Sequence, residues 1–386
     1  MKPSAAILLF VALLHSQELY VRRDAITFKA DYYAPLDTIT MAQFWEQTAV
    51  HSEAFYNGDG SWGLGFFDWP TKPYDADHPL VRAVAYHVMG LLLLMENDLS
   101  DPGMIARCRI SLNWMLERQT PEGAWPLYIT NRGIISSQSV IPTALAGITL
   151  SRGYRVLGNP RYLLAASRAL EWQRVRPEDD SPRNHGLLLL QLMEHYRTVH
   201  DLELLEWAVS EAQIILGRQQ PSGTWADPAP VTTGEHAIIA TALLQLDAAL
   251  VDIDPNKRRI KEGGFSAINF LLENQVNNGN FSTGPTEITN VKVPTLEIIA
   301  LIQARTTRNM AEFDMPIRGA VRALNLHPSN LGPHWRANQA DRFLAMSHAV
   351  VWFTDTQSKR AYTDLESEAG GGPLDTVKVA PGEIGP

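Results

Sequence analysis

The heptapeptide Gln119-Thr-Pro-Glu-Gly123-Ala-Trp125 occurs three times along this chain in nearly the same form. The second copy runs from Gln219 to Trp225 and the third from Gln275 to Phe281, so each reads glutamine, three residues, glycine, one residue and a large aromatic. A fourth copy, from Tyr56 to Trp62, keeps the glycine and the tryptophan but begins with tyrosine. An internal repeat of this kind predicts a chain built from stacked copies of one structural unit.

Each copy of the motif predicts the end of one helix and a tight reversal after it. Glycine has no Cβ and therefore allows backbone dihedral angles that other residues avoid. The aromatic side chain is expected to pack between neighbouring units. A more apolar helix should follow each turn, whereas the helices before the turns, such as 201–218, carry charges at the spacing of a solvated face. The apolar segments are 78–95, 137–150, 185–196, 234–251, 294–304 and 338–353.

The spacing of the motif predicts how many units the chain contains. The aromatic positions are 62, 125, 225 and 281, and the interval of 100 residues between the second and third is nearly twice the others. One unit there has therefore lost its signature, and its turn is expected at 176–185. A sixth turn is expected at 332–335. The sequence thus predicts an all-α fold, an α/α toroid of six outer–inner helix pairs around a central cavity, with an open solenoid as the alternative.

This pattern resembles the repeat of the terpenoid cyclase and protein prenyltransferase superfamily, which includes the squalene–hopene cyclases. The resemblance covers residues from about 44 to 353 and rests on the Gln-x3-Gly-x-Trp signature. It implies the toroid fold. It says less about activity, because related toroids also host sugar lyases, epimerases and binding proteins.

Composition and chain organisation fit one large helical domain. The chain has 386 residues, of which 45% are hydrophobic, and its net charge of −9 argues against nucleic acid as a partner. We expect an N-terminal helical segment over 1–43, the toroid over 44–355 and a disordered tail over 356–386. The apolar run 5–14 has the length of a signal-peptide core but is too short to span a bilayer. Cytoplasmic or membrane-associated localisation is therefore favoured, secretion is left open, and peripheral membrane contact and the oligomeric state are not decided.

Polar residues at the turns before the apolar segments are the candidates for chemistry, because the N-terminal ends of those helices carry unpaired N–H groups and partial positive charge. Asp75-Ala-Asp77-His78 resembles the Asp-x-Asp-Asp motif of class II terpenoid cyclases but has histidine in the last position; helix capping by Asp75 or Asp77 is the alternative. The candidate catalytic residues are Asp77, Asp75, His185, His236 and Glu235. The candidate substrate-binding residues are Phe66, Phe67, Trp69, Tyr74, Tyr128, Arg132, Arg183 and Arg336.

No zinc site, other metal site or cofactor is predicted. Protein prenyltransferases hold zinc with aspartate, cysteine and histidine, but the single cysteine, Cys108, falls in an outer helix, and no histidine pair has a helical metal-binding spacing.

Three functional hypotheses remain. The first, favoured by the resemblance, is a terpenoid cyclase-like isomerase that starts cyclisation of an isoprenoid or polyene by protonation, with aromatic walls stabilising the cation. The second is a lyase or epimerase acting on an acidic, uronate-containing glycan, whose carboxylates the arginines would bind. The third is a non-catalytic binding toroid. The expected partner is accordingly a small isoprenoid or an oligosaccharide.

Overall fold

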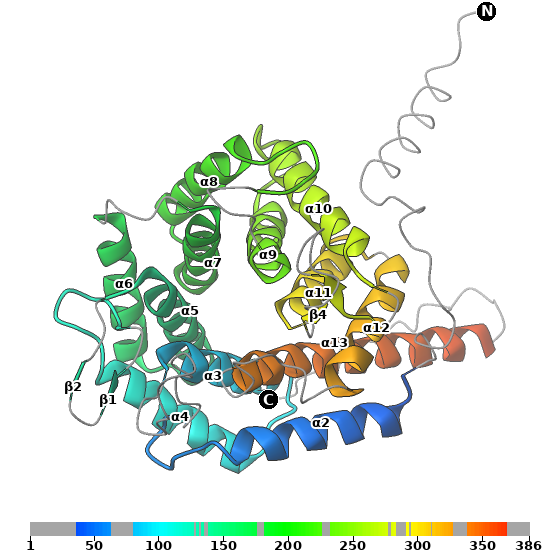
Figure 1. Ribbon diagram of the computed structural model, residues 1–386, viewed down its shortest axis with the longest axis horizontal. Coiled ribbons are helices and arrows are strands. Elements are labelled where there is room, and N and C mark those ends of the chain that lie inside the picture. The colour runs from blue at the N-terminus through cyan, green and yellow to red at the C-terminus, as the bar shows by residue number, and fades with distance from the viewer. Residues whose placement is uncertain are drawn as a thin grey trace, which may run out of the picture.

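Two concentric rings of helices make up the structure (Figure 1). The computed structural model describes residues 36–62, 80–126, 129–130, 133–134, 138–175, 181–225, 232–276, 279–282, 291–292, 295–309, 311–326 and 338–368. The outer ring consists of α2 (Thr38–Glu53), α4 (Pro102–Leu116), α6 (Pro160–Arg174), α8 (Leu202–Gly217), α10 (Lys257–Glu273) and α12 (Asp314–Leu326). The inner ring consists of α3 (Val81–Glu96), α5 (Val140–Leu157), α7 (Pro182–Val199), α9 (Thr233–Ala249), α11 (Leu296–Arg308) and α13 (Asn338–Glu368). The predicted α/α toroid is confirmed.

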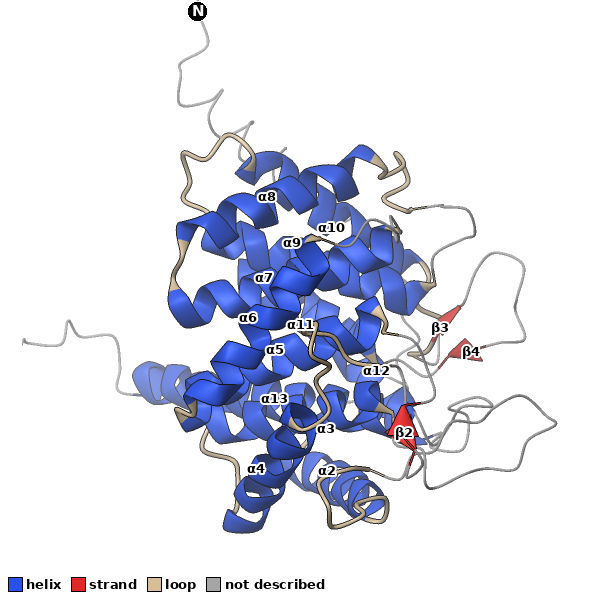
Figure 2. Ribbon diagram, turned by 90° about the vertical axis from the view of Figure 1, so that its left-hand side faces the viewer, coloured by secondary structure: helices blue, strands red, loops and turns tan. Residues whose placement is uncertain are grey.

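The inner ring is closed. Each inner helix packs against the next one along the chain, and α13 packs against both α11 and α3. Two short antiparallel strand pairs precede inner helices: β1 (Ile129–Thr130) with β2 (Gly133–Ile134) before α5, and β3 (Phe281–Ser282) with β4 (Val291–Lys292) before α11. Both pairs lie on the same side of the molecule (Figure 2), which is therefore the face where the inner helices begin.

Helix boundaries follow local capping signals. Asp101, Asn159 and Ser181 each stand directly before a proline, and each side chain accepts a hydrogen bond from a backbone N–H of the first turn that follows. At the other end, Gly158 closes α5 in the left-handed conformation, with φ of 71°. The unit without the motif thus has its inner helix, α7, where the sequence predicts one, beginning at Pro182.

The glutamine of the motif joins consecutive outer helices. Gln119 Nε2 donates to the carbonyl oxygen of Gly123 at 2.9 Å and to that of Ala165, on α6, at 2.8 Å. The other two copies repeat this arrangement, with Gln219 bonded to α10 and Gln275 bonded to α12. We call this pair of hydrogen bonds the glutamine bridge. It fixes each turn to the outer helix of the next unit.

The motif glycines have positive φ and lie against backbone of the next outer helix. Gly223 has φ of 82°, and a Cβ built on it would lie 2.4 Å from the carbonyl oxygen of Ser266 on α10. Gly123 approaches Arg168 on α6 equally closely. Both the dihedral angle and the contact therefore require glycine at this position.

The motif aromatics are buried between units, as predicted. Trp125 and Trp225 are fully buried, and each indole Nε1 donates to a carbonyl ten residues earlier, that of Met115 or Ile215, at 2.9 Å. Phe281 is also fully buried and has no polar atom to satisfy. The aromatic thus fixes its turn to the end of the helix before it.

The ends of the toroid differ from the segment boundaries expected from the sequence. Helix α2 begins at Thr38, before residue 44, and α13 continues to Glu368, past residue 355. The tail expected to be disordered from 356 therefore begins as helix. The division into three segments remains a prediction, and residues 1–35 and 369–386 lie outside the described part. Within the described part, no helix has the length and apolar character needed to cross a membrane.

Burial of His87 is expected to lower the stability of the fold in acid. Its ring on α3 stacks between Trp62 and Phe343, and burial lowers its pKa to about 3, although a hydrogen bond to the Ala83 carbonyl opposes the shift. Below pH 6.5 the unfolded chain takes up a proton that the folded chain does not, so stability is expected to fall by about 1.4 kcal/mol per pH unit between pH 6.5 and 3 from this group.

The measurement is urea unfolding at several pH values between 7 and 4.5 for the wild type and for His87→Phe, which keeps a stacking ring. Groups that titrate in both proteins cancel in the comparison. We expect a shallower loss of stability in the variant, and equal slopes would contradict the assignment.

Candidate functional site: the central cavity

A cavity of about 420 Å³ lies inside the inner ring, and all six inner helices contribute to its lining. Its size is within the range of small-molecule sites, roughly 300–1,000 Å³. The lining changes in character along the helices. On α7, Leu187 and Leu190 come first, and Glu194 and Arg197 follow toward the C-terminal end. The other inner helices show the same order.

The half of the cavity near the helix N-termini is apolar, and the half near their C-termini is polar. The apolar half includes Leu145, Leu187, Ile238, Leu296, Ile299 and Leu344. The polar half includes Asn97, Arg152, Glu194, Arg197, Gln245, Gln303, Thr306, His348 and Asp355. The polar lining of the described residues therefore lies at the face opposite the strand pairs, whereas the sequence predicts chemistry at the turns on the strand face.

An ion-pair network forms one side of the polar half. Arg152 contacts Glu96 at 2.8 Å, and Arg155 contacts Glu96 at 2.6 Å and also pairs with Glu194. Arg197 lies 3.9 Å from Glu194. Burial alone would raise the pKa of the Glu96 carboxyl, but Arg152 and Arg155 outweigh it and hold that pKa below its ordinary value. The Glu96 carboxylate is thus held in its ionised form.

Three side chains that line the cavity make no hydrogen bond to the described residues. His348, Gln245 and Arg197 make none with any part of the chain that the structure describes. Burial, together with the charge of Arg152, lowers the pKa of His348 to about 3, so its imidazole is neutral near pH 7. These groups have donors and acceptors available for a ligand.

Arg183 and Glu235, two of the predicted site residues, are brought together. Arg183 Nη1 donates to Glu235 Oε1 at 3.0 Å across the first turns of α7 and α9. The Glu235 carboxylate also completes a capping box with Thr232 at the start of α9. The geometry gives Glu235 two structural partners at the strand-side face, and neither Glu235 nor Arg183 lines the cavity.

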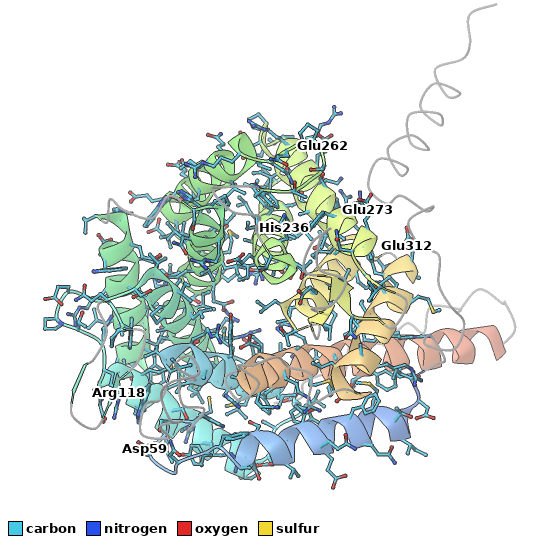
Figure 3. All side chains as sticks on the ribbon, in the orientation of Figure 1. Asp59, Arg118, His236, Glu262, Glu273 and Glu312 are labelled. Carbon is cyan, nitrogen blue, oxygen red and sulfur yellow. The ribbon has the colours of Figure 1, made fainter. Side chains whose placement is uncertain are left out.

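The two predicted catalytic histidines, His185 and His236, bond to neighbouring helices and turns and not to the central cavity. His236, marked in Figure 3, is buried; its Nδ1 hydrogen-bonds to the Thr232 carbonyl, and its Nε2 accepts from the backbone N–H of Trp225. His185 Nδ1 contacts Glu211 on α8 at 2.6 Å, in a small pocket between α6, α7 and α8. Neither ring lines the central cavity, so neither histidine would contact a ligand bound there.

The remaining predicted site residues lie outside the described part of the chain, and their roles stay predictions. They are Asp75, Asp77, Phe66, Phe67, Trp69, Tyr74, Tyr128, Arg132 and Arg336.

Cys108 is described and buried, and burial raises the pKa of its thiol to about 12, which fits a packing residue. No cluster of three or more potential metal-ligating side chains occurs among the residues that the structure covers.

The polar lining was not predicted from the sequence, because the site was expected at the turns before the inner helices. The signal was present as polar residues at helical spacing inside the apolar segments, namely Glu194 with Arg197, Thr241 with Gln245, and His348 with Asp355. Polar side chains are uncommon in protein interiors, so polar residues on the innermost face of an inner helix indicate a cavity.

The fold identifies the class of protein as an α/α toroid, and solved structures of carbohydrate enzymes share it. Cellobiose 2-epimerase from Spirochaeta thermophila superposes with a TM-score of 0.60 at 12% identity, covering 83% of this chain and 99% of that one. A family 76 glycoside hydrolase (mannosidase) from Bacteroides thetaiotaomicron gives 0.60 at 11% identity, with 82% and 99% coverage. A D-mannose isomerase gives 0.57 at 11% identity, with 76% and 87% coverage.

These likenesses concern the fold, because the sequence identities are low. No protein-family model and no curated protein sequence matches the chain. The resemblance to terpenoid cyclases is therefore supported only as membership of the toroid class, and the similar structures include sugar epimerases, an isomerase and glycoside hydrolases.

Proposed function

We propose that this chain is a carbohydrate epimerase or isomerase that moves a proton on a sugar bound in the central cavity. The observation that carries the proposal is His348, a neutral imidazole that lines the cavity without a hydrogen bond to the described residues. The shared fold with a sugar epimerase and a sugar isomerase supports it. The terpenoid cyclase hypothesis has no such support and is set aside.

The chemistry requires a base next to the carbon that carries the exchangeable proton. In an open-chain aldose this carbon is adjacent to the carbonyl. A neutral imidazole accepts its proton, and the electron pair moves onto the carbonyl oxygen to give an enediolate. If the enediolate turns over beside His348, return of the proton to the opposite face of the same carbon gives the epimer. Return of the proton to the former carbonyl carbon, with transfer of the C2 hydroxyl proton to the former carbonyl oxygen, gives the ketose. His348 fits the role of the base.

Arg152 acts on the same step through its charge, which weakens His348 as a base but stabilises the enediolate that forms. Its guanidinium lines the cavity and contributes to lowering the pKa of His348, which places the two groups within electrostatic range. Its bonds to Glu96 at 2.9 and 2.8 Å fix its position. A fixed cation beside the developing enediolate oxygen stabilises the charge that the proton transfer creates. The amide of Gln245 is available for the sugar hydroxyls, which need partners once they leave water.

The test uses reducing sugars, including mannose, glucose and cellobiose, in heavy water, with proton NMR following conversion and loss of the C2 proton signal. We expect His348→Asn to lower the rate by a factor of about 10² to 10⁴, the usual worth of a general base. Because the pKa of His348 is about 3, the wild-type rate should not decline between pH 7 and 5.5 through protonation of this base.

The matched control is His200→Asn. His200 is exposed at the end of α7 with φ of 56°, a conformation that asparagine accepts readily. The His200→Asn variant should convert sugars at the wild-type rate. Absence of turnover with every sugar, or full activity of His348→Asn, would exclude the proposal.

Hydrolysis of a glycoside is the second candidate, favoured by the two carboxylates, Glu194 and Asp355, that line the same end of the cavity. The two functions give different products. Hydrolysis in ¹⁸O-labelled water incorporates the label without exchange at C2, whereas epimerisation exchanges the C2 proton and leaves the glycosidic bond intact.

A further inference from the structure

We infer that the ligand of the central cavity carries an anionic group, a carboxylate or a phosphate, that binds to Arg197 beside Arg152. The inference rests on the proposed function for the sugar part of the ligand and adds its charge. From the sequence, Arg132, Arg183, Lys292 and Arg336 are the expected anion-binding residues; Arg183 is paired with Glu235, and the side chains of the other three lie outside the described part.

Three guanidinium groups share two carboxylates in the ion-pair network, and Asp355 lines the same end of the cavity from α13. Glu96 pairs with both Arg152 and Arg155, and Glu194 pairs with Arg155. These contacts use the carboxylates of α3 and α7 and leave Arg197 as the outermost cation of the network. The cluster therefore has one more positive than negative charge.

Arg197 is the guanidinium whose bonding is incomplete. Its nearest carboxylate oxygen, on Glu194, is 3.9 Å away, beyond hydrogen-bonding distance, and the part of the chain described here offers it no hydrogen bond. Its side chain is 39% exposed, whereas that of Glu194 is 7% exposed. Arg197 can thus reach a ligand without breaking the ion pair between Arg155 and Glu194.

The surroundings disfavour a cation without an anionic partner. Burial is the main cause that lowers the pKa of Arg197; Glu194 opposes it, and the neighbouring charges of Arg152 and Arg155 lower the pKa further. An anion placed between Arg152 and Arg197 would offset both burial and repulsion. A carboxylate or a phosphate presents the paired oxygens that a guanidinium binds in two-pronged fashion.

The other groups around the polar half limit where the anion can bind. His348 on α13 is neutral, and Gln245 and Gln303 on α9 and α11 carry no charge. Asp355 on α13 is exposed and would repel an anion. The anionic group therefore belongs on the α5–α7 side of the cavity, while His348 approaches the ligand from α13.

The experiment is isothermal titration calorimetry of the full chain with four probes: glucose, glucuronate, glucose 6-phosphate and inorganic phosphate. We expect glucuronate or glucose 6-phosphate to bind at least tenfold more tightly than glucose, and the advantage to shrink as salt is raised. The preferred anionic sugar identifies the group as carboxylate or phosphate.

Arg197→Gln should weaken binding of the preferred anionic sugar 10- to 100-fold and leave glucose binding unchanged, whereas Arg197→Lys, which keeps the charge, should retain part of the preference. Arg258→Gln removes the same charge from an arginine that is 83% exposed on α10, and it should behave like the wild type. A melting curve of each variant establishes that it is folded.

Each other outcome overturns a defined part of the inference. Glucose binding as tightly as both anionic sugars would exclude the anionic group and leave the proposed function standing. Inorganic phosphate binding as tightly as glucose 6-phosphate would exclude recognition of the sugar. If Arg197→Gln binds the anionic sugar as tightly as the wild type does, Arg197 is not the residue that binds the anionic group. If no sugar binds, both this inference and the proposed function are excluded.

Discussion

Trp125→Ala is expected to lower the free energy of unfolding by about 3–5 kcal/mol, the usual range for deleting a buried large aromatic. The indole is fully buried between units, so its loss leaves a cavity that the helices around it cannot close. It also leaves the Met115 carbonyl without the indole donor. Chemical denaturation followed by circular dichroism measures the change.

A pair of phenylalanine variants separates packing from hydrogen bonding. Trp125→Phe removes the bond to Met115, whereas Trp62→Phe removes an indole N–H that has no hydrogen-bond partner among the described residues. We expect Trp125→Phe to be the more destabilising of the two by about 1 kcal/mol, the typical net value of one hydrogen bond. An unchanged melting temperature for Trp125→Ala would mean that this residue is not part of the packing between units.

Gly223→Ala is expected to be strongly destabilising. A Cβ there would lie 2.4 Å from the Ser266 carbonyl oxygen, and because that atom belongs to helix backbone it cannot move without shifting α10. Strain from the positive φ contributes about 1–2 kcal/mol, and the overpacking adds about 1–3 kcal/mol.

Gly58→Ala is the matched control for this substitution. Gly58 has the same φ of 82°, but a Cβ on it would meet nothing within 4 Å. It should therefore show the backbone strain without the clash. Denaturant midpoints of the two variants measure the difference, and equal destabilisation would show that the approach of the turn to α10 is unimportant.

The fold could be predicted from the sequence because the motif encodes its own geometry. Gln119, Gly123 and Trp125 each have a separate physical task, and their spacing sets where an outer helix ends and where the next one passes. The unit without the motif was predictable from the interval alone. The ends of α2 and α13 were not, because boundaries set by tertiary packing leave little trace in local sequence.

The candidate site was predicted less well, for a physical reason. Sequence reasoning placed chemistry where polar residues gather at helix starts, but polar residues there also serve as caps, as Glu235 does. His236 likewise has its ring nitrogens bonded to backbone. His348 and Arg197 lie away from the turns, on the cavity side of α13 and α7, and only the closure of the ring places them around one cavity.

The motif is absent between α6 and α7, so no glutamine bridge joins α6 to α8. Glutamine bridges join α4 to α6, α8 to α10 and α10 to α12, but Gln173, in the last turn of α6, bonds to Gln191 on α7. Between α6 and α8, Arg174 stacks on Trp207, and His185 on α7 contacts Glu211 on α8. The three bridges hold α4 to α6, and α8 to α10 and α12, but they do not hold α6 to α8, so a motion that separates α6 from α8 and widens the cavity would leave all three bridges intact.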